Sequence, residues 1–303
     1  MSVRFDNPDR AEPWAQRHWD LRAAGNFIGG GTGTGFLALA AIVVLAGSKT
    51  VLPFIVIGLG FVALGLFCVW LEIGRMFRAA NVLFHPQTSW MTREALVAAP
   101  LFGVGLFAIW FDDRMALVAT AAVGLAFLYC QARILQASKG IPAWRHPLVV
   151  PLIIATGLAE GAGLMGVIGW FVVDDRFYMQ FLPPLFAVLL VARFLVWRTY
   201  IRRLGREGAP LGTLAVLRHY QPMIFGFGHL APFVLFLMGY VISGRSALLS
   251  VMLGAAMALV GGWLIKVVLI TQAAYNQGFQ LPKIPVRGIG MPRPGAKPGW
   301  SEP

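Results

Sequence analysis

The chain has 303 residues, of which 58% are hydrophobic and 13% are charged, with a net charge of +12 and a mean hydropathy of +0.71. Soluble domains are nearer half apolar and a quarter charged, so this composition excludes a soluble protein and indicates an integral membrane protein. The two cysteines, Cys68 and Cys130, lie in apolar runs without CxxC or His/Cys spacing, which excludes an iron–sulfur cluster or structural zinc held by this chain alone.

The apolar runs come in an order that predicts one membrane domain between two polar ends. Residues 1–26 are polar and are predicted to form a cytoplasmic arm. In residues 27–275, eight apolar runs are each long enough to cross a bilayer, which takes roughly 20 residues. Because the runs are long and continuous, we expect an all-α fold with eight transmembrane helices. The predicted spans are 27–47, 51–73, 94–111, 115–137, 147–173, 178–200, 222–243 and 247–275.

Lys and Arg are distributed unevenly between the two sides of these spans. Of the 25, all but Lys49, Arg114, Arg176 and Arg245 lie in the arm, near the loops after the second, fourth and sixth spans, or near the C-terminal end. The positive-inside rule therefore predicts that both termini are cytoplasmic. Residues 276–303 are rich in Pro, Gly and basic residues and are expected to form an extended tail, either a strap over a partner protein or a disordered end.

A glycine-rich stretch opens the first span, from Gly29 to Gly35. Its spacing does not fit a nucleotide-binding loop, and no strand precedes it. Gly29/Gly33 and Gly31/Gly35 form small-xxx-small faces that allow close approach either of another helix or of a flat ligand. Both interpretations stay open, and Asn26 just before the stretch is placed to hydrogen-bond a ligand.

Polar residues gather where the second span ends and the third begins, between Leu71 and Glu94. Charges near hydrocarbon need partners, water or a function. Together with His229, which is about two turns into the seventh span, these residues concentrate polar groups in the cytoplasmic half of the membrane. Such a place suits a quinone headgroup, which needs hydrogen-bond donors and protons beside an apolar wall.

Other polar residues lie within the spans. Glu160, in the middle of the fifth span, either belongs to a proton path or holds two helices together. Arg133, Arg193 and Lys266 are expected near the cytoplasmic ends of their spans, where snorkelling explains each one. Of the five histidines only His229 is expected inside the membrane, so a bis-histidine haem is not expected.

The stretch from Leu71 to Glu94 resembles the membrane-anchor subunits of the dimethyl sulfoxide reductase and polysulfide reductase families. Those anchors share a pattern that is matched here by Leu71, Gly74, Arg78, Ala79 and Asn81, followed by Ser89 to Glu94. The resemblance places the quinol-site glutamate of the family on Glu94. It places the quinol-site histidine on Glu72, which is a departure from the family pattern. Ile141 to Trp144 resembles a second loop motif of these anchors.

Two further stretches, WDLRAAGNFIGGGTGTG and YNQGFQLPKIPVRG, resemble the membrane subunit of phenylacetyl-CoA:acceptor oxidoreductases. This resemblance implies an iron–sulfur subunit and a molybdenum or tungsten bis-pterin catalytic subunit on the cytoplasmic side of a bacterial inner membrane. It implies that catalysis on the organic substrate takes place in another chain. The cofactor of this chain would be a quinone, either ubiquinone or menaquinone, with no haem; a nucleic-acid partner is not expected.

These arguments predict three groups of site residues and leave two rival interpretations, a small-molecule transporter and a purely structural anchor that binds no quinone. The predicted quinone-binding residues are Glu94, Arg78, Asn81, Glu72, His229, Asn26 and Gly30. The predicted proton-transfer residues are Glu94, Glu72 and Glu160. The predicted partner-docking residues are Arg75, Arg145, Trp144, Arg202, Arg203, Lys283 and Arg287. The alternative function is a small-molecule transporter, which Glu160 and the glycine-interrupted helices would suit, and which predicts charged groups meeting at the midplane.

Overall fold

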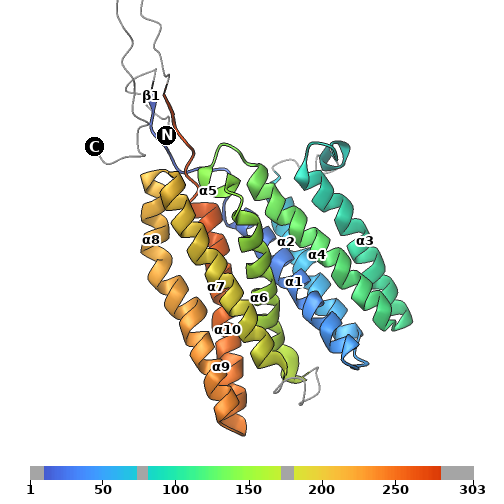
Figure 1. Ribbon diagram of the computed structural model, residues 1–303. Coiled ribbons are helices and arrows are strands. Elements are labelled where there is room, and N and C mark those ends of the chain that lie inside the picture. Colours follow the sequence, from blue (N-terminus) through green and yellow to red (C-terminus); the bar gives the residue numbers. More distant parts are fainter. Residues whose placement is uncertain (1–9, 74–80, 172–180, 281–303) are drawn as a thin grey trace, which may run out of the picture.

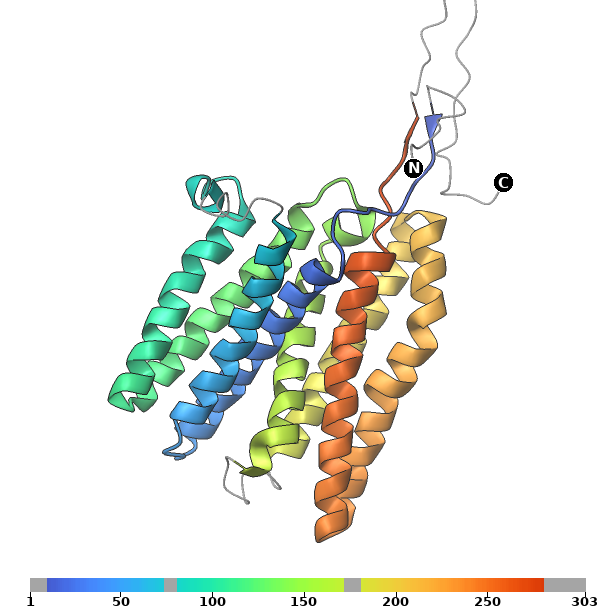
Figure 2. The same ribbon diagram turned by 180° about the vertical axis from the view of Figure 1, so that it is seen from behind.

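The computed structural model describes residues 10–73, 81–171 and 181–280, and within them eight long apolar segments form a bundle of helices (Figures 1 and 2). This confirms the predicted all-α integral membrane fold. Five spans are single helices: α1 (Leu21–Leu45), α2 (Leu52–Glu72), α3 (Trp90–Phe111), α4 (Arg114–Ala137) and α7 (Leu182–Glu207). The fifth span joins α6 (Val149–Ile168) to the short helix η2 (Gly169–Phe171).

The last two spans contain π-helical turns. The seventh runs through α8 (Leu211–Phe225), the π-helical η4 (Gly226–Leu230) and α9 (Ala231–Val241). The eighth runs through α10 (Arg245–Val267) and the π-helical η5 (Val268–Gln272). A short helix, α5 (Pro142–Arg145), lies between the fourth and fifth spans.

Three helices begin four or more residues earlier than hydropathy alone predicts. α1 begins at Leu21 rather than at residue 27, because the Asp20 side chain caps it by accepting from the Arg22 backbone N–H at 2.8 Å. α3 begins at Trp90, where Ser89 caps the Thr92 N–H. α8 begins at Leu211 rather than at residue 222, because Pro222 is accommodated inside the helix instead of starting it.

Glycines of α1 bring it into backbone contact with two neighbouring helices. A β-carbon on Gly29 would lie 2.5 Å from the carbonyl oxygen of Phe61 in α2. On another face, a β-carbon on Gly35 would collide with the backbone of Gly157 in α6, and Gly161 packs on Gly35 in the same way. The described contacts of these glycines are therefore helix packing, the first of the two interpretations of the glycine-rich stretch.

The described ends of the chain pair with each other at one end of the bundle (Figure 1). Strand β1 (Arg10–Ala11) lies antiparallel to β2 (Phe279–Gln280), and a bridge joins Ala15 to Tyr275. The Gln16 N–H also donates to the Ala274 carbonyl at 2.9 Å. This pairing was not predicted from the sequence. An even number of spans requires both ends on one side, which we call the terminal end of the bundle.

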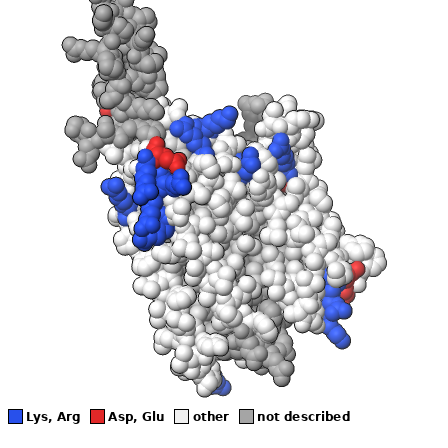
Figure 3. Space-filling view, in the orientation of Figure 1, with Lys and Arg blue, Asp and Glu red and all other residues white. Residues whose placement is uncertain are grey.

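Positive charge gathers at the same end. Figure 3 shows most of the visible Lys and Arg side chains along the terminal end of the bundle, with few at the opposite end. At the opposite end, the Asp113 carboxylate caps α4 by accepting from the Met115 and Ala116 backbone N–H groups at 2.7 and 3.1 Å.

Candidate functional site

A cavity of about 300 Å³ lies among the first four spans at the terminal end of the bundle. Its walls come from the start of α1, the end of α2, the start of α3 and the end of α4. We call it the Glu94 pocket. It is lined by Trp19, Ala23, Asn26, Phe27, Leu66, Val69, Trp70, Glu72, Ile73, Val82, Met91, Glu94, Ala95 and Ile134.

The start of α3 is fixed in a way that directs Glu94 into the pocket. The Thr92 hydroxyl donates to the Val82 carbonyl at 2.5 Å, and the Arg93 guanidinium donates to the Pro86 carbonyl at 2.8 Å. These bonds hold the turn at 81–84 against the first turns of α3. Glu94 then faces α1 and is 6% exposed.

Glu94 is the most deeply buried carboxyl of the pocket. The Asn26 side-chain N–H donates to Glu94 Oε1 at 3.5 Å, and Gln131 of α4 donates to the Asn26 backbone carbonyl at 3.0 Å. Within the described part of the chain, Glu94 has no ion-pair partner, and the side-chain oxygens of Asn26 and Gln131 lack a donor. Because burying an unpaired charge is costly, Glu94 is the pocket group best placed to take up or release a proton.

The rest of the pocket wall is apolar and largely aromatic. Trp19 stacks on Trp144 with ring centroids 4.9 Å apart and tilts against Phe27 at 6.1 Å. Trp70 and Met91 complete the wall. Flat aromatic surfaces beside a few polar groups are typical of sites for planar organic molecules. The side-chain N–H of Asn26 and its unsatisfied side-chain oxygen fit a ring that carries carbonyl or hydroxyl groups.

Three of the residues predicted to bind quinone therefore line one cavity: Asn26, Glu72 and Glu94. Asn81 is exposed and does not line it, although the adjacent Val82 does. Gly30 lies deeper and faces α4, where a β-carbon would lie 2.5 Å from Gln131 Oε1. Arg78 and Arg75 lie outside the described residues.

His229 does not line the Glu94 pocket, so the structure does not bring it together with Asn26, Glu72 and Glu94. It lies in η4 and accepts a hydrogen bond at Nε2 from Arg193 Nε at 3.2 Å. Nδ1 therefore carries the proton in the neutral ring and donates to the Ile224 carbonyl at 2.8 Å. Hydropathy places a residue at a depth in the membrane but does not give its direction around the bundle.

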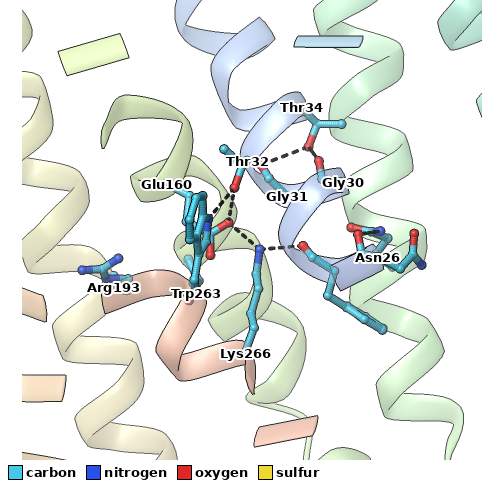
Figure 4. Close-up of polar contacts among 12 residues, drawn as sticks. Asn26, Gly30, Gly31, Thr32, Thr34, Glu160, Arg193, Trp263 and Lys266 are labelled. Carbon is cyan, nitrogen blue, oxygen red and sulfur yellow. Dashed lines mark hydrogen bonds and ion pairs between the residues drawn. The ribbon is translucent and has the colours of Figure 1, made fainter. Parts of the chain in front are cut away.

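Glu160 lies in a buried polar cluster between α1, α6 and α10 (Figure 4). The Lys266 ammonium contacts Glu160 Oε2 at 2.5 Å and donates to the Phe27 carbonyl at 2.7 Å. The Thr32 hydroxyl donates to the same carboxylate oxygen at 3.0 Å, and the Trp263 indole donates to Thr32. These contacts join three helices, as the structural interpretation of Glu160 requires.

Snorkelling does not explain two of the three basic residues for which it was expected. Arg193 and Lys266 are both 0% exposed. Arg193 donates to the Ala258 carbonyl at 2.9 Å and to the Gly228 carbonyl at 2.5 Å. Backbone carbonyl groups therefore take the place of water as hydrogen-bond acceptors for its guanidinium group. Arg133 is partly buried and stacks over Trp90, 4.5 Å from the ring centroid.

The predicted docking residues have different environments. Trp144 is buried and donates to the Leu269 carbonyl at 2.8 Å, so it does not lie on the exposed surface with the predicted docking arginines. The loop motif that contains it packs inward because Tyr200 also binds the Ala143 carbonyl. Arg145 is exposed and donates to Gln277 Oε1 at 2.6 Å, whereas Arg202 and Arg203 are exposed on α7. Lys283 and Arg287 lie outside the described residues.

Sequence reasoning missed several residues of the pocket and the cluster. Gln131 is fully buried beside Asn26, and Thr32 is fully buried beside Glu160. A glutamine inside an otherwise apolar span was the available signal for the first of them. Trp19 and Trp70 carry no such signal, because aromatic residues at the ends of spans are common at membrane interfaces.

Fold and pocket together define a multi-pass membrane protein with an aromatic, carboxyl-bearing cavity at one membrane face. Residues 26–205 match the family model of the DMSO reductase anchor subunit (DmsC), and no curated protein matches the chain. The chain belongs to the family of DMSO reductase anchor subunits. It is thus a membrane anchor subunit of a molybdenum oxidoreductase complex, and this membership implies catalytic and iron–sulfur partner subunits.

Proposed function

We propose that this chain binds a quinone in the Glu94 pocket and passes electrons between an iron–sulfur subunit and the quinone pool. The observation that carries the proposal is the buried Glu94–Asn26 contact inside an aromatic cavity. The cavity lies at the same end of the bundle as the positive charge and the paired terminal strands. Electron exchange between a docked protein and a membrane-soluble molecule requires this proximity.

In this proposal, some residues of the pocket bind the quinone ring and others exchange protons with it. A bound quinone, ubiquinone or menaquinone, would supply two-electron, two-proton chemistry at its two ring oxygens. Asn26 would donate its side-chain N–H to one ring oxygen, and its unsatisfied side-chain oxygen would accept from a ring hydroxyl. Glu94 would exchange a proton with the ring, and the partly exposed Glu72 would exchange it with water at the membrane surface.

The docking surface for the iron–sulfur subunit would be the terminal end of the bundle. Arg145 and Arg203 are exposed there, and we include Arg75, Lys283 and Arg287 from the segments outside the described residues. Arg145, at the end of α5, donates both to the Lys139 carbonyl and to Gln277 of the tail, so the tail would be held in place as a strap beside the partner. A basic surface suits an acidic electron-transfer protein.

We further propose that the complex oxidises a CoA thioester such as phenylacetyl-CoA on the cytoplasmic side of a bacterial inner membrane. The sequence likeness at both ends of the chain and the Lys/Arg distribution support this substrate and this side. Phenylacetyl-CoA added to membranes that contain the complex should then reduce the quinone pool, whereas free phenylacetate should not. Equal reduction by both compounds would contradict the thioester proposal.

The transporter alternative predicted that charged groups meet in the middle of the membrane. Glu160 and Lys266 do form an ion pair in the interior, next to Arg193. Membership of the anchor-subunit family nevertheless favours electron transfer, and these interior contacts hold helices together.

Replacing Glu94 tests the quinone proposal. In the intact complex, Glu94→Gln keeps the shape of the side chain but removes the exchangeable proton, so electron transfer to quinone should fall about 100-fold. Transfer to a soluble dye that accepts electrons directly from the iron–sulfur subunit should be unchanged. Both rates are measured on the same purified sample.

Asp112→Asn is the matched control, because Asp112 is an exposed carboxylate at the opposite end of the bundle. Its backbone is left-handed, with φ 49°, a conformation that asparagine tolerates. This variant should keep both activities. A folded Glu94→Gln complex with normal quinone reduction would rule out the role proposed for Glu94.

A further inference from the structure

Two neighbouring cavities between α7 and the seventh span share a wall formed by Phe194 and Phe225, whose ring centroids are 5.5 Å apart, and we call the two cavities together the groove. The first, of about 380 Å³, is lined by Phe194, Trp197, Arg198, Ile201, Arg202, Arg218, Gln221, Pro222 and Phe225. The second, of about 180 Å³, is lined by Leu190, Val191, Phe194, Phe225, His229, Leu230 and Phe233. Phe194 and Phe225 belong to both. The groove therefore has a cationic part and an apolar part that meet at two aromatic rings.

The cationic part carries three arginines from two helices. Arg198 and Arg202 are one turn apart on the same face of α7, and Arg218 faces them from α8. In the described residues, none of the three forms an ion pair, whereas the neighbouring Arg203 pairs with Glu207 at 3.6 Å. Three guanidinium groups around one cavity repel one another until an anion lies between them, and a phosphate group matches their donor geometry.

The cationic part of the groove lies at the depth of lipid headgroups, and its apolar part lies at the depth of acyl chains. At 1.5 Å per residue, Arg198 lies about 24 Å along α7 from Leu182, and Arg202 about 30 Å, close to the thickness of the hydrocarbon layer. The arginines therefore reach the headgroup region at the terminal end of the bundle. Val191 and Leu230 belong to the deeper part and are 44% and 49% exposed on the protein alone, so they face acyl chains.

We propose that this groove is a binding site for one anionic phospholipid. Its phosphate would lie between Arg198, Arg202 and Arg218. One acyl chain would pass Phe194 and Phe225 and cover Val191 and Leu230. The apolar part of the groove excludes free phosphate as the complete ligand. The lipid would tie α7 to the seventh span.

This inference is independent of the proposed quinone site, which lies among the first four spans. It reassigns Arg202 from partner docking to lipid binding and leaves Arg203 to the partner. A long, negatively charged amphiphile fits both parts of the groove, whereas an acidic protein surface would match only the arginines.

Lipid binding can be measured on the full chain purified in a neutral detergent and delipidated. Dioleoyl phosphatidylglycerol, dioleoyl phosphatidylcholine and inorganic phosphate are added separately, and retention and thermal unfolding are followed by native mass spectrometry and scanning fluorimetry. One phosphatidylglycerol should be retained and should raise the unfolding temperature. Phosphatidylcholine should bind at least about tenfold more weakly, because its headgroup has no net charge, and phosphate alone should not stabilise the protein.

Variants of the arginines locate the site. Arg198→Gln/Arg202→Gln/Arg218→Gln should lower the affinity for phosphatidylglycerol at least about tenfold, because the charge-assisted bonds are lost. The matched control is Arg203→Gln/Arg206→Gln, which removes two exposed charges near the same end of α7 but outside the groove, and it should bind the lipid normally. If the triple variant does not fold, Val191→Trp, which fills the apolar part, should weaken binding instead.

Three results would overturn the proposal. The first is equal binding of the two phospholipids, and the second is full stabilisation by inorganic phosphate. The third is an intact complex, purified in mild detergent, that excludes the lipid while its iron–sulfur subunit cross-links to Arg202→Cys. The last result would assign the groove to the protein partner.

Discussion

Some basic residues of the bundle are buried and others are exposed, and their positions in the sequence do not show which are which. Lys266 and Arg193 are fully buried, with carboxylate and carbonyl partners, whereas Arg203 is exposed and pairs with Glu207. Burial makes the first two pairings costly to break, since removing one partner leaves the other charge without compensation in an apolar interior. The exposed pair is screened by water and contributes little.

Lys266→Met should destabilise the bundle by about 3–5 kcal/mol, because it leaves the Glu160 carboxylate buried and without its ammonium partner. The loss is measured as a shift in denaturant-induced unfolding in mixed micelles. Lys266→Met/Glu160→Gln should recover part of the stability, because the second change removes the uncompensated charge. A single variant as stable as the unmodified protein would contradict the role given to this ion pair.

His146 should make stability depend on pH. Its ring Nδ1 accepts from the Leu148 N–H, and Nε2 lies 3.2 Å from Glu207 Oε2. Burial lowers the pKa of His146 below its usual 6.5, and the attraction of Glu207 only partly opposes this effect. Since the unfolded chain then binds the proton more readily, the free energy of unfolding should fall as the pH drops below 6.5 and stay constant above it.

The measurement compares unfolding temperatures at about pH 7.5 and about pH 5.5, on either side of the ordinary histidine pKa. In His146→Asn the side-chain oxygen still accepts from the backbone N–H two residues on, but the residue does not titrate. The fall in unfolding temperature between the two pH values should therefore be smaller in His146→Asn than in the unmodified protein. A gain in stability of the unmodified protein relative to His146→Asn on acidification would show that the Glu207 contact outweighs burial.

At the scale of the element, α1 is the helix on which its neighbours pack, and its glycines set the distances. Gly29 approaches the backbone of α2, and Gly35 approaches Gly157 and Gly161 of α6. Inside a bilayer the hydrophobic effect does not drive helices together, so their association depends on van der Waals contact. Close approach of the backbones maximises that contact. The same approach brings Asn26 beside Glu94 and Thr32 beside Glu160.

Gly161→Ala should separate α1 from α6, because the added methyl group would meet backbone atoms of Gly35 and Phe36, which cannot turn aside. We expect a loss of about 1–3 kcal/mol in the free energy of unfolding. Gly60→Ala on α2 is the control, because no atom lies within 4 Å of the added carbon. That change should be neutral or stabilising by up to about 1 kcal/mol. Equal effects of the two substitutions would show that the α1–α6 contact is loose.

At the scale of the whole molecule, the predicted orientation can be tested directly. Lys139 lies in the loop before α5 at the terminal end, and Ser243 lies between α9 and α10 at the opposite end; both are exposed. With the partly exposed Cys68 replaced by alanine, a membrane-impermeant maleimide on spheroplasts should label Ser243→Cys. It should label Lys139→Cys only after the membrane is permeabilised. The reverse pattern would place the pocket and its partners outside the cytoplasm.

The Glu94 pocket was partly predictable because three of its polar residues, Asn26, Glu72 and Glu94, lie at the ends of neighbouring spans. Depth in the membrane follows from hydropathy, since each span must cross the same layer. Direction around the bundle does not, so the sequence could not show that His229 lies away from the first four spans. Its depth also differs from the prediction, because the seventh span begins at Leu211 and not at residue 222. Trp19 joins the pocket wall and Gln131 supports Asn26 from behind it, through contacts between residues more than one hundred positions apart.

The sequence by itself determined the class of fold, the number of spans and the end at which positive charge gathers, because each depends on local composition and on the bilayer as solvent. Only the tertiary structure decided which polar residues share a cavity, that Lys266 pairs with Glu160, that Trp144 faces inward and that the two chain ends pair. Each of these depends on the rotation and close packing of helices, which long-range side-chain and backbone contacts fix and which the order of residues does not reveal.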